Sequence, residues 1–214
     1  MKAVLDHFPE LWHGLVKTLG LTLFGFLIGT IVGAFIAICR VSPIKPLRTF
    51  GAVYVGLMVN SPLLFLMVVA FYGVPKLGML INGYRTAVVV IGLYVGGYVA
   101  EALRAGINTV PNGQAEAARS IGLTFAQTLR HIVLPQAVRS SLGPMGVLLN
   151  ATYRNVAVAG AIGVIEFVKA GRDISEQTAQ AVPFFLAQFV VFAVLGLSTS
   201  YGAQWLDHRF AVKR

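Results

Sequence analysis

Five long apolar stretches restrict the fold of this sequence more than any other feature. They run from about Leu15 to Cys39, Phe50 to Tyr72, Thr86 to Leu103, Leu142 to Ile165 and Val182 to Tyr201. All five qualify as membrane spans, because a helix needs roughly 20 mostly apolar residues to cross a bilayer core of about 30 Å. Because lipid cannot satisfy exposed backbone polar groups, the sequence predicts an all-α integral membrane protein with about five transmembrane helices, forming a single domain over residues 1–214.

The composition agrees with a chain that lies in lipid. Hydrophobic residues make up 57% of the sequence and charged residues 12%, so a soluble core of this size would lack the polar surface to cover it. The formal net charge is +9, but the Lys and Arg residues cluster between apolar stretches, as they do in loops kept in the cytoplasm. We interpret the charge as a topology signal and expect no nucleic-acid partner.

The positive residues also choose the orientation, because five spans place the termini on opposite sides. With the N-terminus outside, ten of the 17 Lys and Arg fall in cytoplasmic segments: Arg40, Lys45, Arg48, Arg104, Arg119, Arg130, Arg139, Arg209, Lys213 and Arg214. We therefore expect an external N-terminus and a cytoplasmic C-terminus.

Two features lie inside the spans. Glycines recur every fourth residue at Gly25, Gly29 and Gly33, which indicates either a helix-packing face or the general frequency of glycine in membrane helices. Ser61 followed by Pro62 resembles a helix cap with proline at the first helical position, so the second span is predicted to break there. Broken membrane helices tend to line a cavity, which makes Ser61 a candidate for the wall of a translocation path.

Catalytic and metal-binding patterns do not stand out in the sequence. The four histidines are scattered, Cys39 is the single cysteine, and no phosphate-binding Gly-x4-Gly-Lys-Ser/Thr run occurs. We expect no catalytic residue, no metal site and no cofactor, so any ATP would be bound by a separate subunit.

The segment of about 105–140, between the third and fourth spans, looks soluble. Its sequence predicts a turn at Val110–Gly113, a helix over Gln114–Ile121, and Gly122 in a left-handed conformation after that helix. Thr124 and Gln127 form a capping-box pattern for a second short helix, which is predicted to end near Pro135. On the first helix, Glu116 and Arg119 have the spacing of an ion pair.

This segment resembles the cytoplasmic EAA motif of the membrane subunits of bacterial ABC importers. The resemblance lies in Glu116-Ala117-Ala118, Gly122 and Ile132-x-Leu134-Pro135 at the motif's spacing. It implies a type I importer permease in the bacterial cytoplasmic membrane. It also implies that Glu116, Ala117, Ala118 and Gly122 belong to a coupling helix that docks in a cleft of a cytoplasmic ATPase subunit.

The flanking sequence is similar to the polar amino acid branch of that family, the permeases of histidine, glutamine and glutamate uptake. The similar segments include Tyr98–Glu101, Leu134–Ala137 and Ser61–Leu64. The resemblance implies a pair of ATP-binding subunits, a second permease copy or a sister permease, an extracytoplasmic binding protein, and an amino acid substrate. The chain departs from the branch at Val59–Asn60 and Val156–Ala157, in the region of the translocation path.

Arg154 is the candidate substrate contact, because it lies about halfway along the fourth span. A charge at that depth faces a protein interior, a partner or a watery cavity. In one interpretation it meets the carboxylate of an acidic or amide amino acid such as glutamate, with Asn150 and Asn155 adding hydrogen bonds. In the other it makes a structural pair with Glu166 or a neighbouring subunit. A passive channel or membrane scaffold without ATP coupling remains the alternative function.

Overall fold

The computed structural model describes residues 2–79 and 81–210, and every regular element among them is a helix. In chain order the elements are α1 (Lys2–Asp6), α2 (Phe8–Val41), α3 (Lys45–Asn60), α4 (Leu63–Gly73), the 3-10 helix η1 (Val74–Leu77), α5 (Gly83–Asn108), α6 (Asn112–Ser120), α7 (Phe125–Thr128), the π-helix η2 (Leu129–Val133), α8 (Leu134–Asn155), the 3-10 helix η3 (Val156–Ile162), α9 (Phe167–Thr178) and α10 (Ala181–Phe210).

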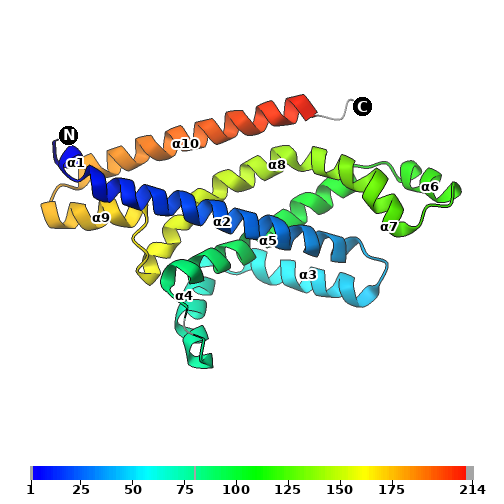
Figure 1. Ribbon diagram of the computed structural model, residues 1–214, viewed down its shortest axis with the longest axis horizontal. Coiled ribbons are helices and arrows are strands. Elements are labelled where there is room, and N and C mark those ends of the chain that lie inside the picture. Colours follow the sequence, from blue (N-terminus) through cyan, green and yellow to red (C-terminus); the bar gives the residue numbers. More distant parts are fainter. Residues whose placement is uncertain (1, 80, 211–214) are drawn as a thin grey trace.

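The expected membrane spans are present in the expected order. Four helical segments are long and apolar enough to cross a membrane, and a bent pair of helices makes a fifth span if it is counted as one: Phe8–Val41, Gly83–Asn108, Phe125–Ile162, Ala181–Arg209, and the pair Lys45–Asn60 with Leu63–Leu77. The long helices run along the length of the molecule (Figure 1). We call α6, α7 and the turn between them the elbow; it lies at one end of the molecule, whereas α1 and α9 lie at the other.

The second span is broken where the sequence predicts it. The axes of α3 and the α4–η1 segment differ by 102°. The predicted role of Ser61 as a helix cap is wrong, because Ser61 ends α3 and Pro62 stands before α4, with no capping hydrogen bond from either side chain. Pro62 is itself extended, with φ −62° and ψ 128°, so α4 starts one residue later than predicted, at Leu63, and Ser61 does not adjoin it.

The fourth span begins earlier than predicted, and the second elbow helix does not end near Pro135. Helix continues from Phe125 through η2 and α8 to Ile162. Pro135 lies in the first turn of α8, directly after the π-turn. Because proline has no N–H to donate, the regular i→i−4 bond cannot form there, and the irregular turn lets the helix continue.

Close packing of α2 on α5 is the basis of the bundle. A Cβ atom added to Gly29 would lie 2.9 Å from Val95 Cβ, and one added to Gly33 would lie 2.5 Å from Val99 Cβ. A Cβ at Gly25 would similarly meet Ile91. The glycine spacing is therefore a packing face, because only glycine lets the two backbones approach this closely.

Candidate functional site

The elbow turns on Gly122, which has the predicted left-handed conformation with φ +86°. The backbone N–H of Leu123 donates to the Ala118 carbonyl at 3.1 Å, and that of Gly122 donates to the Arg119 carbonyl at 3.0 Å. These two bonds form a Schellman motif, which satisfies carbonyls that the end of α6 would otherwise leave unpaired.

The other side of the elbow is fixed by the predicted capping box. The Thr124 hydroxyl accepts from the Gln127 N–H at 3.3 Å, and the Gln127 side-chain oxygen accepts from the Thr124 N–H at 2.9 Å. Because both helix ends at the corner are capped by local bonds, the chain reverses with a defined geometry rather than through a loose loop.

The expected docking residues differ in exposure. Glu116, Ala117 and Gly122 are exposed, whereas Ala118 is 4% exposed and packs within the chain. The expected ion pair between Glu116 and Arg119 does not form, so the Glu116 carboxylate projects from the elbow without a basic partner among the described residues.

Ile121 is a surface feature that the sequence prediction missed. It is 78% exposed at the tip of the elbow, next to Gly122. Its exposure could have been expected from its position at the end of a short, mostly polar helix, because such a helix has no apolar face on which the isoleucine can pack. Together with the exposed Glu116 and Ala117, it gives the elbow a surface with both an apolar and an acidic contact.

Polar contacts connect the elbow region to the spans. The Gln136 side chain of α8 donates to the Gln114 side chain of α6 and to the Ile132 carbonyl, the latter at 2.9 Å. The Thr109 hydroxyl after α5 lies 3.1 Å from the Ser140 hydroxyl of α8. α6 and the end of α5 are therefore each joined to α8 by a direct side-chain contact.

A three-residue ion network ties α2 to α5 near the same end. Arg104 pairs with Glu101 at 2.9 Å, as their spacing on one helix predicts, and Arg40 of α2 joins the same carboxylate. Glu101 thus has a structural partner from each helix.

Arg154 and Asn150 lie together, in a cleft of about 500 Å³ between α8 and α10. The Asn150 amide donates to the Gly196 carbonyl at 3.1 Å and to the Ser200 hydroxyl at 2.9 Å, which joins the two helices. Arg154 is exposed and donates to the Asn150 carbonyl at 3.2 Å. The alternative pairing of Arg154 with Glu166 does not occur.

Asn155 and Ser61 lie apart from that cleft. Asn155 lines a separate cavity of about 200 Å³ with Tyr94, Tyr98 and Thr152, whereas Ser61 is not among the residues that line either space. The Tyr98 hydroxyl lies 3.1 Å from that of Tyr94 and donates to the Val59 carbonyl at 3.3 Å, close to the break in the second span. The sequence prediction missed this tyrosine pair, although its i, i+4 spacing in an apolar span was a usable signal.

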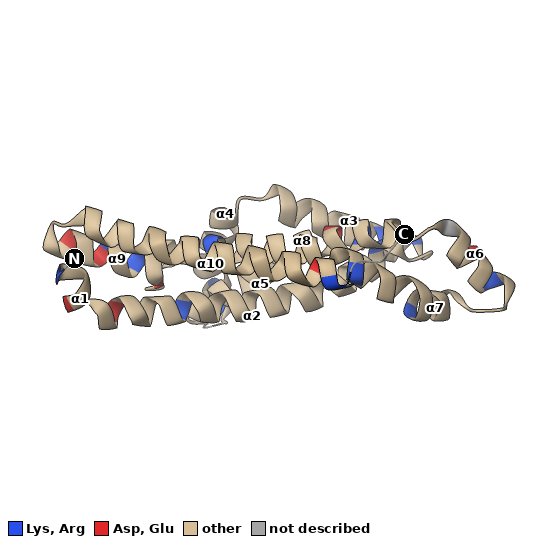
Figure 2. Ribbon diagram, turned by 90° about the horizontal axis from the view of Figure 1, so that it is seen from above, with Lys and Arg blue, Asp and Glu red and all other residues tan. Residues whose placement is uncertain are grey.

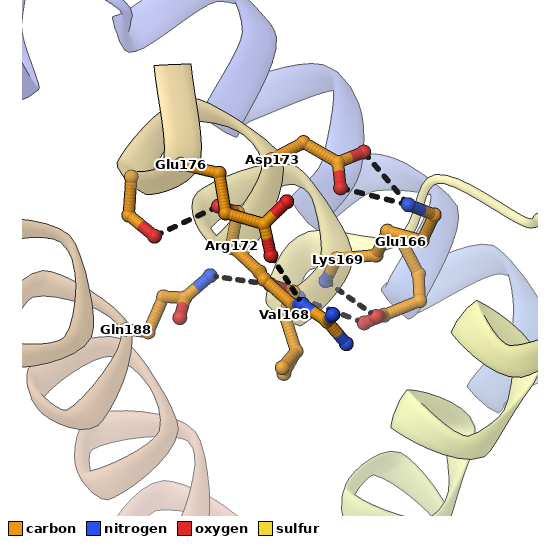
Figure 3. A network of polar contacts seen from close by, with 8 residues as sticks. Glu166, Val168, Lys169, Arg172, Asp173, Glu176 and Gln188 are labelled. Atoms are coloured by element: carbon orange, nitrogen blue, oxygen red, sulfur yellow. Dashed lines mark hydrogen bonds and ion pairs between the residues drawn. The ribbon is translucent and has the colours of Figure 1, made fainter. Parts of the chain in front are cut away.

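Glu166 forms a buried joint at the start of α9 (Figure 3), and α9 lies at the end of the molecule opposite the elbow (Figure 1). Its carboxylate accepts from the backbone N–H groups of Val168 and Lys169 at 2.9 and 2.7 Å, and from the Thr18 hydroxyl at 3.4 Å. The Gln188 amide of α10 adds a bond to the Val168 carbonyl at 3.2 Å. Burial raises the pKa of the Glu166 carboxyl, and these hydrogen bonds partly oppose the shift. The joint therefore holds α2, α9 and α10 together.

No group of three His, Cys, Asp or Glu side chains that could bind a metal ion occurs in residues 2–79 and 81–210. The fold is that of a type I ABC importer permease.

Comparison with known proteins shows the family. Residues 9–212 match the family described as "Binding-protein-dependent transport system inner membrane component", and the chain belongs to that family. It is therefore a multi-pass permease of the inner membrane.

Several relatives resemble the chain over almost its whole length. It is 37% identical to a glutamate transport system permease protein of Corynebacterium glutamicum, with 96% of each chain covered. It is 30% identical to a probable glutamine ABC transporter permease protein of Bacillus subtilis, covering 96% of this chain and 95% of the relative. A crystal structure of an amino acid ABC transporter with histidines aligns with a TM-score of 0.89 at 29% identity, covering 96% of each chain.

Proposed function

We propose that this chain forms the translocation path of an ATP-driven amino acid uptake system and couples to a separate ATPase through its elbow. The observation that carries the proposal is the elbow itself. A corner fixed by a Schellman motif and a capping box presents Glu116, Ala117 and Ile121 to water at one end of the bundle. A passive channel has no need of such a surface.

The coupling follows from the contacts of the elbow with the spans. Closure of two ATPase subunits around ATP would displace α6, and the contacts from Gln114 to Gln136 and from Thr109 to Ser140 would carry that displacement into α8 and α5. Interfaces of this kind switch between discrete arrangements, so a small movement at the elbow can change which side of the membrane the path faces.

The residues of the path that we propose are Arg154 and Asn150 in the cleft between α8 and α10, and Asn155 with Tyr94 in the smaller cavity. A guanidinium group binds a carboxylate through parallel charge-assisted hydrogen bonds. The α-carboxylate of any amino acid can accept these bonds. Relatives described as glutamate and glutamine permeases support an acidic or amide amino acid as the substrate.

The proposed assembly contains a pair of cytoplasmic ATP-binding subunits, a second permease copy or a sister permease, and an extracytoplasmic binding protein. The exposed apolar surface of α10, which includes Phe189, Val194 and Leu197, would face lipid or the second permease. The elbow end would lie in the cytoplasm, since Lys and Arg gather there (Figure 2).

Uptake of labelled amino acids tests the proposal. In right-side-out membrane vesicles, accumulation should require hydrolysable ATP inside the vesicle, on the elbow side, and acidic or amide amino acids should compete best. Equilibration of the substrate without ATP would favour a passive channel and contradict the proposal.

A further inference from the structure

A second cavity lies between the elbow, the end of α5 and the turn that joins α2 to α3. Its volume is about 470 Å³, within the range of sites that bind small molecules. Most of its wall is apolar and includes Val41, Ile107, Leu129 and Val133. The proposed transport mechanism does not use this space.

The hydroxyl of Thr128 identifies the cavity as more than an apolar gap. Thr128 lines the cavity and is 6% exposed, and its Oγ1 is the one buried side-chain polar atom of the described residues without a hydrogen-bond partner. A buried hydroxyl is costly to leave unpaired. Thr128 also stands directly before the π-helix η2, and π-turns often mark functional sites. These observations point to a ligand that supplies the missing partner.

The charge at the cavity indicates an anionic ligand. Arg119 borders it, and no ion pair joins its guanidinium to another described residue. Segments 40–48 and 101–139 hold seven Lys and Arg against two Glu: Arg40, Lys45, Arg48, Arg104, Arg119, Arg130 and Arg139 against Glu101 and Glu116. Figure 2 shows this basic character around α3, α6 and α7.

The position of the cavity indicates an amphiphile. Val41 and Asn108 are the last residues of two helices that are long and apolar enough to span a membrane, and both line the cavity, so it lies at the end of two candidate spans, where we expect the membrane boundary. An anionic group beside an apolar wall at that depth matches a phospholipid, whose headgroup occupies the same boundary and is attracted by basic residues.

We propose that this cavity binds an anionic phospholipid. The lipid phosphate accepts hydrogen bonds from the Arg119 guanidinium and the Thr128 hydroxyl, and the start of the acyl chains packs on Val41, Leu129 and Val133. The lipid would contact α6, η2 and the ends of two spans at once, so it would stabilise one position of the elbow relative to the bundle. This inference does not depend on which substrate is carried.

Native mass spectrometry of the transporter, purified with its ATPase subunits, tests the site. Phosphatidylglycerol and phosphatidylethanolamine are the probes, and the variants are Arg119→Gln, Thr128→Val and the control Arg130→Gln, which removes an exposed cation of η2 outside the cavity lining. We expect Arg119→Gln to weaken phosphatidylglycerol binding roughly tenfold and Thr128→Val roughly fivefold. Arg130→Gln should leave it unchanged, and phosphatidylethanolamine should bind more weakly to every form.

Several outcomes would overturn the site. Equal loss in Arg119→Gln and Arg130→Gln would show general attraction to a basic surface. Displacement of the lipid by millimolar inorganic phosphate would indicate a free-anion site. Lipid bound to the separated permease but absent from the assembled transporter would show that a partner side chain fills the cavity. Thr128→Val keeps the side-chain shape, so it carries the test if Arg119→Gln fails to assemble.

Discussion

Replacement of Gly122 by valine tests the elbow with little other disturbance. No atom of the described residues lies within 4 Å of a Cβ atom at this position, so within this chain the effect of the substitution comes from the backbone. An L-residue at φ +86° costs about 2 kcal/mol, and relaxation to another conformation would break the two Schellman bonds. A change of that size shifts the population of the correct corner by roughly 30-fold. We expect Gly122→Val to abolish ATP-driven uptake while membrane insertion remains normal.

The assay compares uptake of labelled amino acid in vesicles with the amount of permease in the membrane. A graded series sharpens it: asparagine tolerates the left-handed conformation, so uptake should fall in the order Gly122→Asn, Gly122→Ala, Gly122→Val. Gly202→Val is the matched control, since Gly202 is also exposed and open but lies in α10 without a positive φ. Full uptake by Gly122→Val, or equal loss in Gly202→Val, would refute the reasoning.

Three further substitutions test the joint, the path and the cavity. Burial raises the pKa of Glu166 in the folded state, so ionisation of this carboxyl destabilises the fold. The free energy of unfolding should therefore fall as the pH rises from the usual carboxyl range through the raised pKa. In melting curves measured against pH, Glu166→Gln should remove that dependence. Arg154→Gln should weaken the apparent affinity for substrate, and unchanged affinity with poor assembly would show a structural role instead. In lipid-free detergent Thr128→Val should raise the melting temperature by roughly 2–4 °C, because the unpaired hydroxyl that it removes destabilises the fold by about 1 kcal/mol. An unchanged or lower melting temperature would mean that the hydroxyl has a partner in solution.

Features set by local sequence were predictable. The glycine corner, the capping box and the break before Pro62 each depend on a few neighbouring residues, and the structure has all three. The start of the fourth span was not predictable in the same way. Proline normally interrupts a helix, but here a π-turn accommodates Pro135, and no local sequence pattern predicts that turn.

The arrangement of the proposed path was predicted only in part. Asn150 and Arg154 are four residues apart, so they share a face of α8, whereas Asn155 is rotated by about 100° from Arg154 and lines a different cavity. That separation could have been derived from helical geometry. Which face of α8 meets α10 could not, because it depends on contacts such as that of Asn150 with Ser200, which lie far apart in the sequence.

Cross-linking from the elbow tests most directly whether an ATPase binds there. The single native cysteine, Cys39, is buried, so cysteines placed at the exposed positions Ala117 and Glu176 would report on the two ends of the molecule with little background. In native membranes we predict that Ala117→Cys captures a nucleotide-hydrolysing protein and that Glu176→Cys does not. Failure to capture such a protein from the elbow, or equal capture from both ends, would contradict the account.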